Sequence, residues 1–191
     1  MGYTTGLLNL LYPVYDIYRS YVDPKSDLPL RAIRNVHEQK YTDYKLDRFL
    51  HRQGDSTLVV RENGDTLTLP PAALDLVSAF FYLRNRLDGL ELKPGTRIQL
   101  PTMFNGEYFG LLVECREVEV LKTKFGKLKC LRLVPYVQAG GLFTEEDGLS
   151  VWLTADANHL PIKIRFKLFI GALTCTLEQF ENLRWPLEVI M

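Results

Sequence analysis

The sequence predicts a mainly β fold, namely a curved antiparallel meander sheet (a half-barrel or open barrel) with one α-helix packed against it near residues 71–87. Short segments of β-type alternation are separated by turn signals such as Asn-Gly and Pro-Gly along most of the chain. Only one stretch changes to helical spacing. Ten Tyr, ten Phe and two Trp are an aromatic content typical of side chains that pack across sheets.

The totals predict one domain over residues 1–191. A chain of this length with 47% apolar residues can bury a sizeable core. Acidic and basic residues number 23 each. Proteins that bind nucleic acid through phosphates usually have a basic face, and the totals predict none. No apolar run approaches the ~20 residues of a spanning helix, so the chain is not expected to cross a membrane helically.

Residues 12–22 allow two readings. Tyrosines at 12, 15, 18 and 21 fit a helical stripe, whereas the segment as a whole also alternates like a strand. Pro13 argues against a helix interior, so a strand is favoured. Both faces of that strand mix aromatic and polar groups, so the alternation does not show which face packs against the core.

Strands follow at about 30–39, 43–52 and 56–62, and Asn63-Gly64 predicts a tight hairpin into residues 66–69. The helix comes next, because apolar residues recur at helical spacing from Pro71 to Leu87. Pro71 suits its first turn and Gly89 the position just after its end.

The second half returns to strands. A short strand is expected at 97–100, and Asn105-Gly106 predicts a hairpin into a long strand over about 107–123, whose partner covers about 127–137. A two-residue turn at Phe125-Gly126 would place Val120 opposite Leu131, Val118 opposite Leu133 and Glu119 opposite Arg132. Irregular phase between Arg116 and Val118 predicts a bulge or bend.

Three cysteines, Cys115, Cys130 and Cys175, leave at least one thiol unpaired within the chain. In the register above Cys115 faces Tyr136 and Cys130 faces Leu121. These two cysteines are then too far apart for a disulfide. Each cysteine is expected to be small, buried and unpaired.

Val151 to Leu177 reads as three short strands joined by two turns. The first turn is Asp156-Ala157-Asn158, whose side chains can bond their own backbone. On the middle strand the basic residues Lys163, Arg165 and Lys167 share one face and alternate with apolar ones. They could bind phosphate or carboxylate groups of a lipid or glycan, although an ordinary solvated sheet face is the favoured interpretation.

Five segments together resemble an exported bacterial family, domain of unknown function 3108, common in Bacteroidetes. They are Tyr12 to Asp23, Leu28 to Glu38, Asp75 to Arg84, Leu121 to Cys130 and Val151 to Ile162. The resemblance implies export to the periplasm or cell envelope. It also implies a β-rich fold similar to the half-barrels of lipoprotein-localisation factors and YmcC-like lipoproteins, and it supplies no catalytic residues.

Relatives in this family begin with a signal peptide and further strands. This sequence shows no signal peptide, because Gly6 to Leu11 is too short and lacks a basic flank. The resemblance therefore implies either that the chain begins late or that N-terminal strands present in relatives are absent.

Residues of catalytic or metal-binding type do not form a motif. His37, His51 and His159 lack neighbours at metal-ligand spacing, and a Cys-His pair would have to be assembled by the fold. A flexible turn explains Ala139-Gly140-Gly141, and a solvated acidic turn explains Glu145-Glu146-Asp147 better than a calcium loop does. An aromatic groove from Tyr82, Arg84 and Trp152 is possible, with core packing as the default. We therefore expect no metal, no cofactor and no enzyme.

Three functions remain as hypotheses. The first, which we adopt, is a non-catalytic cell-envelope protein that holds a lipid, an acyl chain or a glycan in a curved β-sheet. The second is a structural or assembly protein that docks on an envelope partner. The third is an enzyme of unrecognised type, which would need a polar cluster assembled in a pocket.

Overall fold

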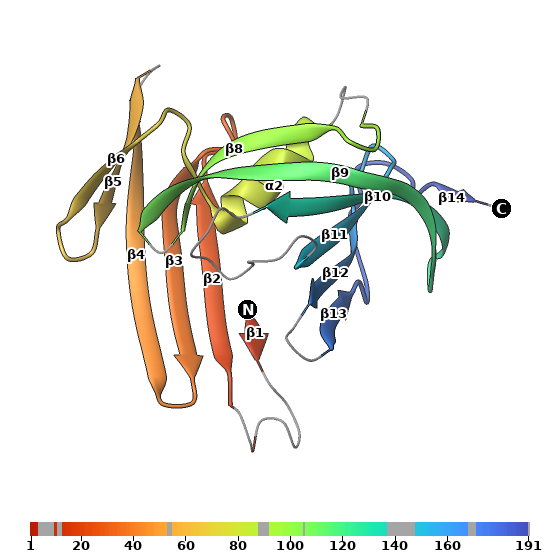
Figure 1. Ribbon diagram of the computed structural model, residues 1–191, viewed down its shortest axis with the longest axis horizontal. Coiled ribbons are helices and arrows are strands. Elements are labelled where there is room, and N and C mark those ends of the chain that lie inside the picture. The colour runs from red at the N-terminus through yellow and green to blue at the C-terminus, as the bar shows by residue number, and fades with distance from the viewer. Residues whose placement is uncertain are drawn as a thin grey trace. The chain divides into compact units, whose positions relative to one another are not determined.

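The computed structural model describes residues 1–3, 10, 13–52, 55–87, 92–104, 106–136, 148–167 and 171–190. Within these residues the strands form two sheets (Figure 1). The six-stranded sheet runs in chain order through β1 (Gly2–Tyr3), β2 (Tyr15–Val22), β3 (Pro29–Glu38), β4 (Tyr41–Arg52), β5 (Ser56–Arg61) and β6 (Thr66–Leu69). Consecutive strands pair antiparallel, as in a meander.

The second sheet has eight described strands. Its path runs β13–β12–β11–β10–β9–β8–β7, and β14 pairs with β10 beside that path. The bounds are β7 (Leu74–Asp75), β8 (Arg97–Phe104), β9 (Glu107–Thr123), β10 (Gly126–Tyr136), β11 (Leu149–Thr154), β12 (Pro161–Lys167), β13 (Ala172–Thr176) and β14 (Val189–Ile190). The short pair β7–β8 is parallel.

The predicted fold class is confirmed. In the described residues the first sheet is an open meander. The second follows a meander order from β8 to β13, with β7 added in parallel beside β8 and β14 beside β10, and neither sheet closes into a barrel. The predicted helix is present as α2 (Leu76–Arg86). No helix in the described ranges has the length and apolar content needed to cross a membrane.

The chain divides into two compact units. The first contains Met1–Leu83 and Pro101–Phe109, and the second contains Arg84–Leu100 and Gly110–Met191. Because β8 and β9 each contribute to both, the division falls inside continuous strands. The single domain over 1–191 stays a prediction, and the units are described separately below.

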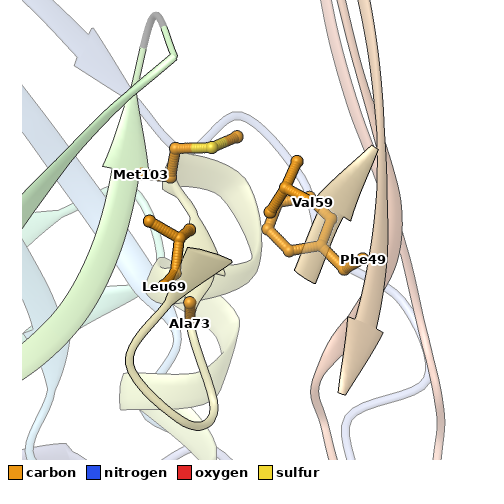
Figure 2. Close-up of a cluster of buried hydrophobic side chains, with 5 residues drawn as sticks. All are labelled: Phe49, Val59, Leu69, Ala73 and Met103. Atoms are coloured by element: carbon orange, nitrogen blue, oxygen red, sulfur yellow. The ribbon is translucent and has the colours of Figure 1, made fainter. Parts of the chain in front are cut away.

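The core of the first unit forms where the inner face of the meander is apolar. Phe49 lies opposite Val59 in the β4–β5 register, and both are almost fully buried. Figure 2 shows these two side chains near Met103, with Leu69 and Ala73 completing the cluster. Burying side chains of this size contributes roughly 1.5–3 kcal/mol each, so this cluster holds β4, β5 and β6 against β8.

The helix begins later than its apolar spacing predicts. Pro71 and Ala72 lie in a turn, where Ala72 has a φ of 57°, and α2 starts only at Leu76. Asp75 caps the helix, because its Oδ1 accepts hydrogen bonds from the backbone N–H groups of Val77 (2.9 Å) and Ser78 (3.2 Å). The Ser78 hydroxyl accepts in return from the Asp75 N–H at 3.0 Å. This reciprocal cap outweighs the weaker preference for Pro in a first turn.

One buried cluster of the second unit is formed by β10, β11, β12 and the turn before β12. Leu128, Cys130, Trp152, Leu160 and Ile162 are buried together. Residues after β13 cover this cluster, namely Leu177, Phe180, Leu183 and Leu187. Phe180 also packs against Phe125 at the β9–β10 turn, with ring centroids 4.9 Å apart.

The predicted register of the β9–β10 hairpin is wrong by two residues. Thr123 pairs with Gly126, so the turn is Lys124-Phe125, and Leu131 lies opposite Val118 rather than Val120. The Thr123 hydroxyl explains the choice, because it accepts from the Phe125 N–H (3.0 Å) and donates to the Gly126 carbonyl (2.9 Å). A shift of two preserves which side chains share a face.

The bulge predicted in β9 is confirmed. Arg132 pairs with Glu117 but Leu133 pairs with Cys115, so Arg116 is the extra residue. Cys115 and Cys130 are buried and free, as expected, whereas Cys175 is exposed, contrary to the prediction. Cys175 lies on β13, an edge strand whose five residues are all exposed.

Most other strand predictions are confirmed, with small adjustments. The segment 12–22 is a strand over Tyr15–Val22, not a helix. The short strand expected at 97–100 continues to Phe104. The Asn63-Gly64 hairpin is present, but Arg61 and Asp65 close it through an N–H···O bond of 2.9 Å, which leaves a three-residue loop. Gly64 supplies the positive φ of 88° that such a loop needs.

Several predictions fall outside the described residues. They concern residues 6–9 and 11 of the opening segment, the tyrosine at 12, Gly89, Asn105, Ala139-Gly140-Gly141 and Glu145-Glu146-Asp147.

Candidate functional site

The inner face of the first sheet changes from apolar to charged along β4. Next to the Phe49 row, the same face of this strand carries Asp43, Lys45 and Asp47 at every second position. The register places Arg34 of β3 opposite Lys45 and Arg61 of β5 opposite Asp47. Directly opposed residues share a face, so three cations and two carboxylates gather on this part of the sheet.

Ion pairs and hydrogen bonds order this charged group. Arg34 forms an ion pair with Asp43, and the Lys45 ammonium lies 3.4 Å from the same carboxylate. Arg34 Nε also donates to the Tyr18 hydroxyl at 3.4 Å. Arg61 Nη2 donates to the Gly106 carbonyl at 2.5 Å, which ties the end of β5 to the start of β9.

Asp47 is a half-buried carboxylate close to Arg61 and Lys45. Burial raises the pKa of its carboxyl above the ordinary value. Arg61 and Lys45 offset part of this rise, and the neighbouring Asp75 carboxylate adds to it. A half-buried carboxylate with a raised pKa in a hollow is a candidate ligand-binding group.

Asp75, although close by, has a structural role. Its side chain caps α2 through Oδ1, and its Oδ2 accepts from the Ser20 hydroxyl at 2.7 Å. Asp75 is 7% exposed. Both oxygens are therefore engaged, and the residue joins β2 to the helix start.

Two hollows flank Lys45 and Asp47, and both lie within the first unit. The smaller, of about 50 Å³, is bounded by Tyr18, Arg34, Asp75 and Met103 together with these two residues. The larger, of about 390 Å³, is lined by Tyr44, Lys45, Leu46, Asp47, Arg61, Glu62, Asn63 and Gly106. Its lining offers donors and acceptors in nearly equal number, a composition that can hydrogen-bond a polar, uncharged or mixed-charge ligand.

The basic residues singled out from the sequence lie elsewhere, on β12 of the second unit. Lys163 is half-buried, and its ammonium lies 4.2 Å from the centroid of the Trp152 ring, a cation–π contact. Arg165 and Lys167 are exposed and follow it along the same strand face. The three residues alternate along β12, as the sequence predicts.

The residues suggested for an aromatic groove are Tyr82, Arg84 and Trp152. Trp152 is buried, and its Nε1 donates to Glu119 at 2.7 Å. Arg84 instead donates twice to the Asn158 carbonyl, at 3.2 and 2.9 Å, and so fixes the predicted turn. Tyr82 is half-buried on α2. Arg84 and Trp152 therefore have structural partners.

The 156–158 turn is a buried polar network, as its residue types predict. Asp156 Oδ1 accepts from the Thr154 hydroxyl (2.6 Å) and from the Asn158 N–H (3.0 Å). Although burial alone would raise its pKa, these hydrogen bonds and one from the Glu188 N–H lower the pKa of Asp156. Asn158 then holds the chain near Trp185 through its side-chain amide.

His51 and Cys130 each bond to other groups of the described structure. His51 is held between Thr57 Oγ1 (3.0 Å) and the Pro29 carbonyl (2.8 Å), and His37 is exposed. Burial raises the pKa of the Cys130 thiol to about 11, with Glu119 and Asp156 adding to the effect. Within the described ranges no three His, Cys, Asp or Glu side chains converge as metal ligands.

The sequence alone does not identify the charged group on β4 as a site, although the spacing of its charged residues is a signal. Tyr41 to Phe49 contains charged residues at 43, 45 and 47, which is period two. Alternation alone does not say whether such a row faces solvent or the core side. Only the register with Phe49 and Val59 assigns it to the inner face.

Comparison with known proteins gives a fold neighbour and a family. No curated protein matches the chain. Among solved structures, it is similar to a crystal structure described as a beta-barrel-like protein of domain of unknown function DUF1849 from Brucella abortus, with a TM-score of 0.60 and 8% identity over 88% of this chain and 73% of that one. At that identity the likeness shows the fold alone. The model of DUF3108, a protein of unknown function, matches residues 1–178, and the chain belongs to this family.

Proposed function

We propose that this protein is a non-catalytic binding module of the cell envelope and that its ligand is a glycan segment held beside Lys45, Asp47 and Arg61. The observation that carries the proposal is the hollow of about 390 Å³ next to these residues. Its volume lies in the range typical of small-molecule sites.

The lining favours a glycan over a lipid or an acyl chain. An acyl chain needs an apolar lining, whereas this hollow presents an ammonium, a guanidinium, two carboxylates and an amide. Sugar hydroxyls both donate and accept, so they match such a mixed set without leaving buried groups unpaired. Tyr44 adds an aromatic side chain at the rim.

The envelope location is part of the same proposal. It rests on the resemblance to exported proteins, and fractionation of the native host with an antibody to this chain tests it. Recovery in the cytoplasmic fraction would contradict it. The structural or assembly role on an envelope partner stays a prediction.

Isothermal titration with two probes, a neutral N-acetylhexosamine tetramer and a uronic-acid tetramer, tests the ligand. We expect at least one to bind, and Asp47→Asn or Lys45→Met to weaken binding by about tenfold or more, since a hydrogen bond to a charged group is worth roughly 1.5–3 kcal/mol. The matched controls Asp55→Asn and Lys25→Met change exposed residues of the same unit that lie outside the hollow.

Two outcomes would overturn the glycan assignment. One is that neither probe binds; the other is that the controls weaken binding as much as the hollow variants do. Hydrolysis of either probe during the titration would instead contradict the non-catalytic part of the proposal.

A further inference from the structure

In strands β2–β5 of the first sheet the carboxylates lie on one face, whereas cations lie on both. The outer face is the side of β2–β5 whose central row is Tyr21, Arg31, Arg48 and Val60, paired across the strands. Strand alternation places Asp16, Glu38, Asp43 and Asp47 on the inner face. The charged side chains of the outer face are Arg19, Arg31, Arg48 and Arg52, so this surface is basic although the whole chain is neutral.

The positions of the outer-face arginines destabilise the first sheet. Arg31 and Arg48 lie directly opposite each other, and like charges in that position destabilise a sheet. None of the four outer arginines forms an ion pair with a described residue, and Arg31 instead lies over the Tyr21 ring at 4.1 Å. A basic row without carboxylate partners matches an anionic surface outside the molecule.

Apolar residues separate the arginines on the same face. Ile33 lies opposite Leu46, and Leu50 lies opposite Leu58. None of these four side chains is buried, and Leu50 is 53% exposed. A solvated sheet face is usually polar. This face instead mixes arginine, tyrosine and aliphatic side chains, so a complementary partner would have both negative charges and apolar groups.

We propose that the outer face docks on the surface of an anionic phospholipid bilayer. Headgroup phosphates would pair with the arginines, and the aliphatic rows and Tyr21 would reach the boundary with the acyl chains, where tyrosine is favoured. Single-stranded nucleic acid offers phosphates and flat bases but no counterpart for Leu50 and Leu58. The proposal does not depend on the glycan hollow, because none of the four outer arginines lines it.

The size of the face suits a peripheral contact. Four neighbouring strands span about 15 Å, since strands lie roughly 4.8 Å apart. Each basic residue near an anionic surface contributes about 1 kcal/mol, which is about a fivefold change in binding. The four arginines together therefore suffice for reversible membrane association.

Sedimentation with vesicles tests the proposal. The full chain is mixed with vesicles of phosphatidylcholine alone or with 30% phosphatidylglycerol, at about 0.1 M salt. We expect binding only to the anionic vesicles, and a loss of about 25-fold in the partition coefficient for Arg31→Gln/Arg48→Gln. Leu50→Asn should lower the binding that survives at high salt.

Lys122→Gln/Lys127→Gln is the matched control. These two lysines lie opposite each other on β9 and β10, so the variant removes the same net charge from a different sheet. We expect it to retain vesicle binding within threefold. Circular dichroism melting of each variant separates lost binding from lost fold.

Three results would overturn the proposal. They are no binding to anionic vesicles, equal binding by Arg31→Gln/Arg48→Gln, or a larger loss in the lysine control than in the arginine variant. Tighter binding to single-stranded RNA than to anionic vesicles, abolished by the same arginine variant, would assign the face to nucleic acid instead.

Discussion

At the scale of single residues, Asp47 combines a cost to stability with a candidate role in binding. Its carboxyl pKa is raised, chiefly by burial, so the folded state binds a proton more tightly than the unfolded state does. Stability therefore falls as the pH rises from the ordinary carboxyl pKa through the folded-state pKa. Above the folded-state pKa the full cost is present.

Asp47→Asn removes that cost. We expect the variant to have a higher melting temperature than the parent chain at pH 7, while the difference shrinks at a pH below the ordinary carboxyl pKa. Thermal unfolding at several pH values measures it. Equal or lower stability of the variant at pH 7 would show that Arg61 and Lys45 compensate the charge fully. Greater stability with weaker glycan binding is the pattern of a residue kept for function.

At the scale of elements, the hairpin register shows what the sequence leaves open. Phe125-Gly126 and Lys124-Phe125 are both possible two-residue turns, and a slip of two keeps every side chain on its face. The choice depends on the Thr123 hydroxyl bonds and on Gly126, which has a φ of 115°. Side-chain alternation carries no information about either.

Gly126→Ala tests the importance of that position. A Cβ on Gly126 would approach Val189 Cγ1 of β14 to 2.5 Å, and the positive φ adds strain. We expect a loss of about 2–4 kcal/mol in the free energy of unfolding, measured by chemical denaturation.

Gly64→Ala is the paired comparison, because Gly64 also has a positive φ but a Cβ there would meet nothing within 4 Å. This variant should lose only about 1–2 kcal/mol. If the two alanines cost the same, the contact of β14 with the hairpin turn contributes nothing measurable.

The first residue of α2 is another feature that the local sequence leaves open. The apolar period extends back to Ala73, and Pro71 fits a first turn, so the sequence favours a helix from residue 71. Asp75 and Ser78 form a reciprocal cap, and Leu74-Asp75 pairs with β8 instead. A strand pairing from a distant segment thus decides where the helix begins.

At the scale of the whole molecule, the three thiols report on folding. Cys115 and Cys130 are about 1% and 0% exposed, whereas Cys175 is exposed on an edge strand. We expect a maleimide to add once to the native chain and three times in guanidinium chloride, as counted by intact-mass spectrometry. Cys175→Ser should remove the native adduct. Fast labelling of two or more sites in the native protein would contradict the buried positions of Cys115 and Cys130.

The sequence by itself determined the strands, the helix, the open meander class and the β9 bulge, because these depend on local period and turn chemistry. It also carried the family resemblance that the DUF3108 match confirms. Only the tertiary structure decided the hairpin register, the helix start, the exposure of Cys175 and the placement of Asp43, Lys45 and Asp47 on the inner face. The physical reason is that alternation separates two faces of a strand but does not say which face a distant segment will cover.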